Sequence, residues 1–249
     1  MDMFTDPAFW IAVGQIIMID ILLGGDNAVV IALACRRLPP AQRTKGIIWG
    51  TAGAIILRVV LIFFALQLLA IPYLKIVGAL LLVWIGVKLL APDEDGHGDI
   101  SASDKLWAAV KTIIVADLVM SVDNVIAIAG AAQGAGEHQL ILVIFGLLVS
   151  IPIIVWGSQL VIKLMDRFAF IITAGGMLLG WIAGTMAVTD PAIVGFMPLA
   201  SAPVQGQVPE VVGSLRHGAG AAGALLVLAI GMLLQRRREA AAAPVAKGH

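Results

Sequence analysis

Seven long runs of apolar residues constrain the fold of this sequence more than any other feature. A helix that crosses a membrane needs about 20 mainly apolar residues. Only 13% of the 249 residues are charged, whereas about 25% are charged in an average soluble domain. We therefore expect an all-α, polytopic membrane protein with seven transmembrane helices, at residues 8–35, 45–71, 73–91, 106–132, 138–163, 168–188 and 218–235.

The positions of lysine and arginine predict how the chain is oriented. Thirteen of the 16 basic residues flank the first, third and fifth connections between the runs or follow the last run. Cytoplasmic loops are enriched in these residues, so we expect an outside N-terminus and a cytoplasmic tail at 236–249, in the cytoplasmic membrane of a bacterium. The formal net charge is zero, which gives a nucleic-acid partner no electrostatic footprint.

One polar motif occurs twice inside the apolar runs, ninety-seven positions apart. The first copy runs from Asp20 to Ala34 and the second from Asp117 to Ala131. Ionisable residues inside a membrane are costly and mark functional sites. We take the acidic and amide residues of both copies as a metal-cation site: Asp20, Asp26, Asn27, Asp117, Asp123 and Asn124. Possible supporting residues are Gly24, Gly25, Ser121 and Arg58.

The duplication extends beyond the motif. Residues of the third run recur in the sixth at the same offset, as Gly78 and Gly175 and as Trp84 and Trp181. Because each repeat contains three spans, an odd number, the second must enter the membrane from the opposite side, as in secondary transporters with inverted repeats. We predict a single transmembrane transporter domain over 1–249, made of repeat one at 8–91, repeat two at 106–188, an extra helix at 218–235 and the tail.

The chemistry of the motif favours a hard divalent cation. Carboxylate, amide and hydroxyl oxygens suit Mn²⁺, Ca²⁺ or Mg²⁺, and neither copy contains the His or Cys that zinc or copper prefers. Asp20 and Asn27 share one face of a helix because seven residues span about two turns. The adjacent Gly24 and Gly25 permit local unwinding, so we expect a break in the first span that frees backbone carbonyls.

Arg58 lies near the middle of the second run. A buried arginine needs a partner, and the motif carboxylates are the obvious ones. It would either neutralise one aspartate permanently or hold the empty site until a cation displaces it. The alternative is an arginine that extends along its helix to the membrane surface.

With its two Asp-x5-Asp-Asn motifs, the sequence resembles the shorter branch of the TerC family of bacterial integral membrane proteins. The resemblance covers nearly the whole chain, including Gly-Trp-Ile-Ala-Gly at 180–184 and Thr-Asp-Pro at 189–191. The family is named for tellurium resistance and is similar to the LysE transporter superfamily, and the resemblance implies manganese export. A site this acidic is a poor receptor for tellurite, which is an anion.

Together these features predict a secondary transporter that exports a divalent cation, foremost Mn²⁺, by exchange with protons. We expect no enzymatic activity and no prosthetic group, with the cation and the lipid bilayer as partners. Two alternatives stay open: a proton or monovalent-cation pathway, and a membrane scaffold that delivers metal to the secretion machinery. The sequence leaves open the identity of the ion, the coupling, the number of ions bound and a homo-oligomeric state.

Overall fold

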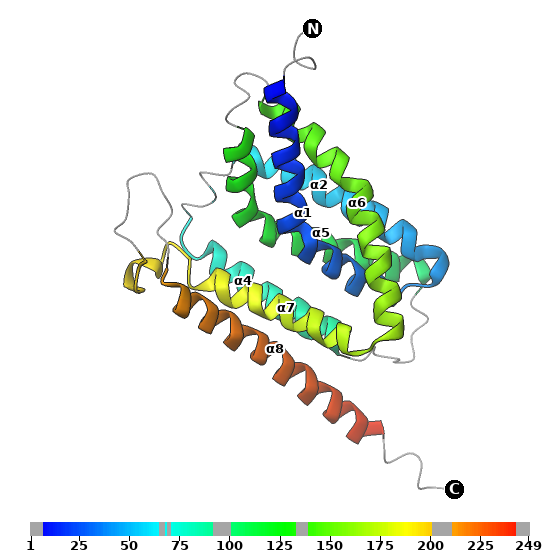
Figure 1. Ribbon diagram of the computed structural model, residues 1–249. Helices are drawn as coiled ribbons and strands as arrows, with labels where there is room; N and C mark the ends of the chain where they lie inside the picture. The colour runs from blue at the N-terminus through cyan, green and yellow to red at the C-terminus, as the bar shows by residue number, and fades with distance from the viewer. Residues whose placement is uncertain are drawn as a thin grey trace, which may run out of the picture. The chain divides into compact units, whose positions relative to one another are not determined.

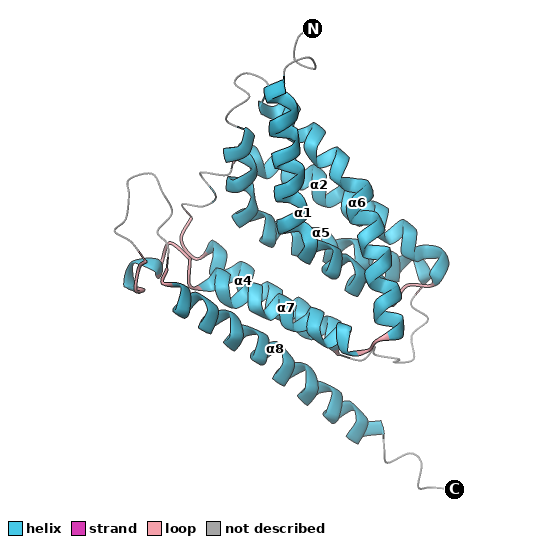
Figure 2. Cartoon of the chain, in the orientation of Figure 1, coloured by secondary structure: helices cyan, strands magenta, loops and turns pink. Residues whose placement is uncertain are grey.

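The computed structural model describes residues 7–64, 68, 71–91, 101–132, 139–200 and 211–242. Within these ranges the chain forms seven α-helices and one short 3-10 helix (Figure 1), and the described part contains no strand (Figure 2). The α-helices are α1 (Pro7–Cys35), α2 (Pro40–Phe63), α4 (Leu74–Leu90), α5 (Ala102–Ala132), α6 (Gln139–Arg167), α7 (Phe170–Ala187) and α8 (Gly213–Ala242). The 3-10 helix, η3, spans Val194–Phe196.

Each of the seven apolar runs coincides with one α-helix, so the prediction of an all-helical fold is confirmed. Among the described residues, four helical segments are long and apolar enough to cross a membrane: Pro40–Ile62, Ile144–Arg167, Phe170–Ala187 and Gly213–Arg237. Seven spans therefore stay a prediction, whereas helical membrane character is established.

The bounds of α2 differ most from those expected. The helix begins at Pro40, earlier than residue 45, because proline is well suited to the first helical position, where no backbone N–H is needed. It ends at Phe63, and Phe64 leaves the helical conformation with φ −108° and ψ 10°. The apolar run continues to residue 71, so hydrophobicity alone did not show where this helix stops.

The chain divides into two compact units. The first comprises Met1–Ile71 and Ile100–Arg167, and the second comprises Pro72–Asp99 and Phe168–His249. In the first unit α1 packs mainly on α6 and α2 mainly on α5, with further contacts between α1 and α5 and between α2 and α6 (Figure 1). In the second unit α7 packs against both α8 and α4. Each unit thus combines helices from both of the repeats predicted from the sequence.

Small residues bring α7 and α8 together in the second unit. A Cβ atom at Gly184 would lie 2.0 Å from the carbonyl oxygen of Ala219, and one at Gly180 would lie 2.3 Å from that of Gly223. Real Cβ atoms do not approach backbone so closely. The two helix backbones therefore meet at a distance that only glycine permits, the small-residue contact common between membrane helices.

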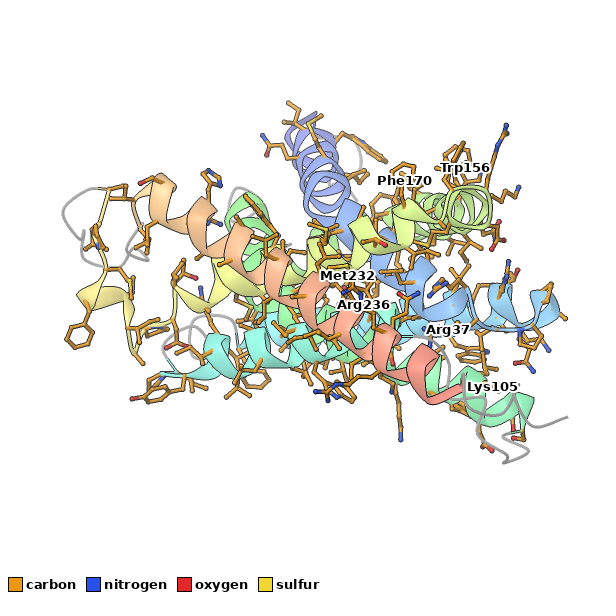
Figure 3. The ribbon with its side chains drawn as sticks, turned by 90° about the horizontal axis from the view of Figure 1, so that it is seen from below. Arg37, Lys105, Trp156, Phe170, Met232 and Arg236 are labelled. Atoms are coloured by element: carbon orange, nitrogen blue, oxygen red, sulfur yellow. The ribbon has the colours of Figure 1, made fainter. Side chains whose placement is uncertain are left out.

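Large apolar side chains also lie on the outside of the helices. Trp156 of α6 is 68% exposed and extends away from its helix in Figure 3. Phe170 at the start of α7 is 70% exposed, and Met232 of α8 is 46% exposed. In water such surfaces would be unfavourable, whereas lipid chains accommodate them.

Candidate cation site

The first unit contains a buried ion pair that joins α2 to α5. Arg58 Nη2 donates a hydrogen bond to Asp117 Oδ1 at 2.5 Å, and the two side chains are only 3% and 7% exposed. Arg58 thus has a motif carboxylate as its partner, as the sequence analysis expected, and does not extend to the surface. Because the carboxylate of Asp117 is buried among apolar helices, it needs a nearby opposite charge, and the guanidinium of Arg58 provides it.

Ser121 forms hydrogen bonds with both members of this ion pair. Its hydroxyl donates to Asp117 Oδ2 at 2.9 Å and accepts a hydrogen bond from Arg58 Nε at 3.0 Å. Residues four apart on a helix lie on the same face, which is why Ser121 and Asp117 of α5 meet. The serine therefore bonds to both the arginine and the aspartate, and its supporting role at a metal site stays a prediction.

A small cavity adjoins the ion pair. Its volume is about 10 Å³, roughly the room that one water molecule needs. Residues of α1, α2, α5 and α6 form its wall: Asn27, Val30, Ile31, Thr51, Ala54, Ile55, Arg58, Ile113, Asp117 and Ile154. One residue of each motif copy, Asn27 and Asp117, thus lines the same cavity.

Asn27 and Thr51 are buried in this wall, at 4% and 2% exposure. Neither the amide of Asn27 nor the hydroxyl of Thr51 has a hydrogen-bond partner among the described residues. Buried polar groups are nearly always paired with protein, water or an ion. These two side chains therefore indicate a place prepared for a small polar ligand.

Asp26 is half-buried on α1, next to the cavity residue Asn27. Its carboxylate accepts a hydrogen bond from the backbone N–H of Asn27 at 2.8 Å. It lies close enough to Arg58 and Asp117 to interact electrostatically with both. Carboxylates from both motif copies thus share one electrostatic environment.

The other predicted ligands lie partly outside the description. Asp20 belongs to α1, and Asp123 and Asn124 belong to α5, but their side chains are outside the described part of the structure, and of Gly24 only its place in α1 is described. Their place in the site stays a prediction. Among the described residues, no group of three or more His, Cys, Asp or Glu side chains lies close enough together to hold a metal ion. The oxygen donors described at the cavity are the carboxylate of Asp117, the amide of Asn27 and the hydroxyl of Thr51.

The expected break at Gly24 and Gly25 is wrong. The helix α1 runs without interruption from Pro7 to Cys35, so no unwound turn offers free carbonyls to a cation. Glycine in a helix interior costs only about 1 kcal/mol, and an unpaired backbone group in an apolar surrounding costs several. The helical hydrogen bonds therefore prevail over the flexibility of the glycines.

Sequence reasoning missed Thr51. A single threonine in an apolar helix carries no signal by itself, but it precedes Arg58 by seven residues. That spacing places both side chains on one face of α2, and this relation to the arginine was the signal available.

The second unit contains a buried carboxylate that the sequence did not single out as functional. Asp190, with 0% exposure, accepts hydrogen bonds from the backbone N–H groups of Tyr73, Lys75, Ile76 and Ala192 at 2.7 to 3.2 Å. Burial alone would raise the pKa of Asp190, but these four hydrogen bonds together hold it below the ordinary value of 3.8. The carboxylate caps the N-terminus of α4, where the helix dipole also favours a negative charge.

Lys75 is part of the same arrangement. It is 4% exposed, and its Nζ donates to Thr189 Oγ1 at 3.4 Å. Tyr73, with φ 66°, turns the chain into α4 and brings its N–H toward Asp190.

The fold and the site define a class: a helical integral membrane protein with a buried arginine–aspartate pair beside a small, partly polar cavity among its helices. Residues 5–239 match the model of the family described as integral membrane protein TerC family. The chain belongs to the TerC family, as its motifs had indicated.

Three relatives illustrate this membership. The chain is 45% identical over 182 residues to the uncharacterized membrane protein YjbE of Bacillus subtilis, which covers 73% of this chain and 81% of that protein. It is 29% identical over 195 residues to the uncharacterized membrane protein YceF of the same bacterium, covering 75% and 74%. It is 24% identical over 180 residues to the UPF0053 inner membrane protein YgdQ of Escherichia coli, covering 66% and 74%. No solved structure matches.

Proposed function

We propose that this protein is a secondary transporter that exports a divalent metal cation, foremost Mn²⁺, across the cytoplasmic membrane. The observation that carries the proposal is the meeting of Asn27 and Asp117, one from each motif copy, at one buried cavity. Structural stability does not require a carboxylate and an unpartnered amide inside an apolar helix bundle. Ionisable residues inside a membrane commonly mark ion pathways.

The oxygen donors favour this class of substrate. Asp117, Asp26 and Asn27 offer carboxylate and amide oxygens, the ligands of Mn²⁺, Mg²⁺ and Ca²⁺. We propose that Asp20, Asp123 and Asn124 complete the ligand set. The residues act by binding and releasing the ion, so the proposed activity is transport and not enzymatic catalysis, and no prosthetic group takes part.

Helix packing supports an inverted repeat as the framework. Under the duplication α5 corresponds to α1 and α6 corresponds to α2. The contact of α1 with α6 and the contact of α2 with α5 are then equivalent, as a two-fold relation between the repeats requires. Because these contacts join the repeats, we propose that access alternates through movement within the four helices of the first unit. Rocking of one whole repeat against the other is less favourable, because it would separate α1 from α6, which pack against each other.

Proton exchange is the proposed source of energy. Carboxylates bind either a metal ion or a proton, and groups that repel one another in a low-dielectric site retain protons more readily. Release of a proton from such a carboxylate would accompany binding of the cation, and the reverse would follow on the other side. The relatives described as membrane proteins support the location, and the inner membrane named for YgdQ supports the cytoplasmic membrane.

Uptake of Mn²⁺ into inverted membrane vesicles tests this proposal. Vesicles with the protein should accumulate Mn²⁺ when their interior is acidic, and Asp26→Asn and Asp117→Asn should each abolish most of that uptake. Equal uptake by vesicles with and without the protein would contradict the proposal. Uptake that needs no divalent ion, measured as proton flux alone, would instead favour the proton pathway.

A further inference from the structure

The wall of the cavity beside the Arg58–Asp117 pair contains a polar residue, Thr51, that is not in the proposed set of cation ligands. Thr51 of α2 is 2% exposed, and its hydroxyl has no hydrogen-bond partner among the described residues. It lines the same cavity as Asn27, whose amide nitrogen and oxygen are equally without partners in the described ranges. Buried polar groups are nearly always paired with protein, water or an ion, so both side chains are candidates to bond a ligand in this cavity.

The side chains that line the cavity indicate which chemical class of ligand it can bind. Four polar side chains line the cavity, namely Asn27, Thr51, Arg58 and Asp117, and the remaining wall is aliphatic. Asn27 and Thr51 can both present an oxygen lone pair, and Asp117 carries a negative charge. Three oxygens of this kind suit a hard cation. A volume of about 10 Å³ accommodates one small ion or one water molecule.

Arg58 already occupies the carboxylate that such a cation needs. Its Nη2 lies 2.5 Å from Asp117 Oδ1, and its Nε donates to Ser121 at 3.0 Å. A guanidinium and a divalent ion have charges of the same sign. Because like charges repel strongly where water is excluded, both cannot contact Asp117 at once without a large penalty.

We infer that the cavity receives the transported cation with Thr51 as one of its ligands, and that the cation displaces Arg58 from Asp117. The inference rests on the proposed function and deepens it. Arg58 is then an internal counter-ion: it neutralises the buried carboxylate between transport cycles and competes with the substrate for it. Binding and release of the ion are thereby coupled to a movement of one side chain between α2 and α5.

The two possible roles of Arg58, competing with the cation for Asp117 or only bracing the helices, predict different effects when the arginine is removed. If the cation binds away from Arg58 and Asp117 and Arg58 only braces the helices, removing the arginine weakens or leaves unchanged the binding of a cation. If Arg58 competes with the cation, removing it strengthens binding, although the protein without metal becomes less stable because Asp117 is left as an unpaired buried charge. Added metal should then restore that lost stability.

Binding of Mn²⁺ to the purified full chain in detergent, measured by titration calorimetry, tests both parts. We expect Arg58→Gln to bind Mn²⁺ at least about tenfold more tightly than the unmodified protein, and Thr51→Val to bind it about tenfold more weakly. Thr185→Val is the matched control, because this hydroxyl bonds to the carbonyl of Ile182 in α7 of the second unit, and its affinity should not change.

A second variant protects the test against misfolding of Arg58→Gln. Arg58→Lys keeps a positive charge but loses the Nε–H that Ser121 accepts, so the lysine should compete less well and Mn²⁺ should bind severalfold more tightly. The thermal unfolding temperature of both variants should also rise more with Mn²⁺ than that of the unmodified protein. Unchanged or weaker binding in both variants would overturn the competition, and a Thr51→Val affinity equal to that of Thr185→Val would overturn the role of Thr51.

The outcome also separates this inference from the proposed function. If the unmodified protein neither binds nor transports Mn²⁺, both are overturned. If it does both, and the Arg58 and Thr51 variants behave like the control, only the inference is overturned.

Discussion

The carboxylate of Asp190 accepts a hydrogen bond from the backbone N–H of Lys75, a residue 115 positions earlier in the chain. Three more backbone N–H groups donate to the same carboxylate, from Tyr73, Ile76 and Ala192. This single side chain therefore connects the loop after α7 to the first turn of α4.

Replacing that carboxylate should destabilise the second unit in a pH-dependent way. Asp190→Asn removes the negative charge that the four N–H groups and the helix terminus favour, and should cost about 2 kcal/mol at neutral pH. Because the pKa of Asp190 is lowered in the folded protein from 3.8, its stabilisation is present above the unfolded value and is lost as the pH falls through the folded value.

Thermal unfolding of both proteins in detergent, measured from pH 7 down to pH 3, checks this expectation. The difference between the unmodified protein and Asp190→Asn should shrink as the solution becomes more acidic. A difference that grows with acidity, or no difference at pH 7, would refute the role given to Asp190.

The Arg58–Asp117 pair should show strong energetic coupling. Either Arg58→Met or Asp117→Leu alone leaves one buried charge without its partner, which typically costs about 3–5 kcal/mol. The double variant removes both charges and should recover most of that loss. A double-mutant cycle on the unfolding free energy in mixed micelles measures the coupling. Additive effects of the two substitutions would mean that the pair does not interact in the folded protein.

The close contact of α7 and α8 should not tolerate even a methyl group. In Gly184→Ala the new Cβ would collide with the backbone of Ala219, so the helices must separate, at a cost of about 1–3 kcal/mol. Gly218→Ala is the matched control in α8, because a Cβ there meets nothing within 4 Å. The control should be neutral or slightly stabilising, since alanine favours helices. Equal unfolding temperatures for the two variants would contradict this contact.

The distribution of basic residues predicts the orientation of the chain. A fluorescent reporter that matures only in the cytoplasm should be bright when fused after residue 249, and a periplasmic phosphatase fused there should be inactive. Fusions in the segment between α7 and α8 should give the opposite result. A periplasmic C-terminus would contradict the predicted orientation.

The helical architecture was predictable because it depends on composition over long stretches. All seven apolar runs became helices, and the buried Arg58 found one of the expected carboxylates. The end of α2 at Phe63 was not predictable, because apolar residues continue beyond it in the sequence. The break predicted at Gly24 and Gly25 was wrong, because in an apolar surrounding the need to satisfy backbone hydrogen bonds outweighs the flexibility of glycine.

The site was predictable only in part. The duplication singled out Asn27 and Asp117, which line one cavity in the structure, and their binding of a cation stays a prediction. Thr51 and Asp190 were not found as functional or structural centres, because their roles depend on neighbours distant in the chain. Thr51 faces residues of α1 and α5, and Asp190 reaches the N-terminus of α4. Periodicity within one helix contains no information about such contacts.

The most direct test of the central claim is Mn²⁺ flux through the purified protein in liposomes, with Asp117→Asn compared with Asp166→Asn. Both substitutions remove one carboxylate charge, but Asp117 is buried at the cavity, whereas Asp166 is 53% exposed and pairs with Arg43 at the surface. We predict Mn²⁺ flux that is driven by a pH gradient, is abolished by Asp117→Asn and is unchanged by Asp166→Asn. Flux that survives in a folded Asp117→Asn protein, or that falls equally in both variants, would contradict transport through this site.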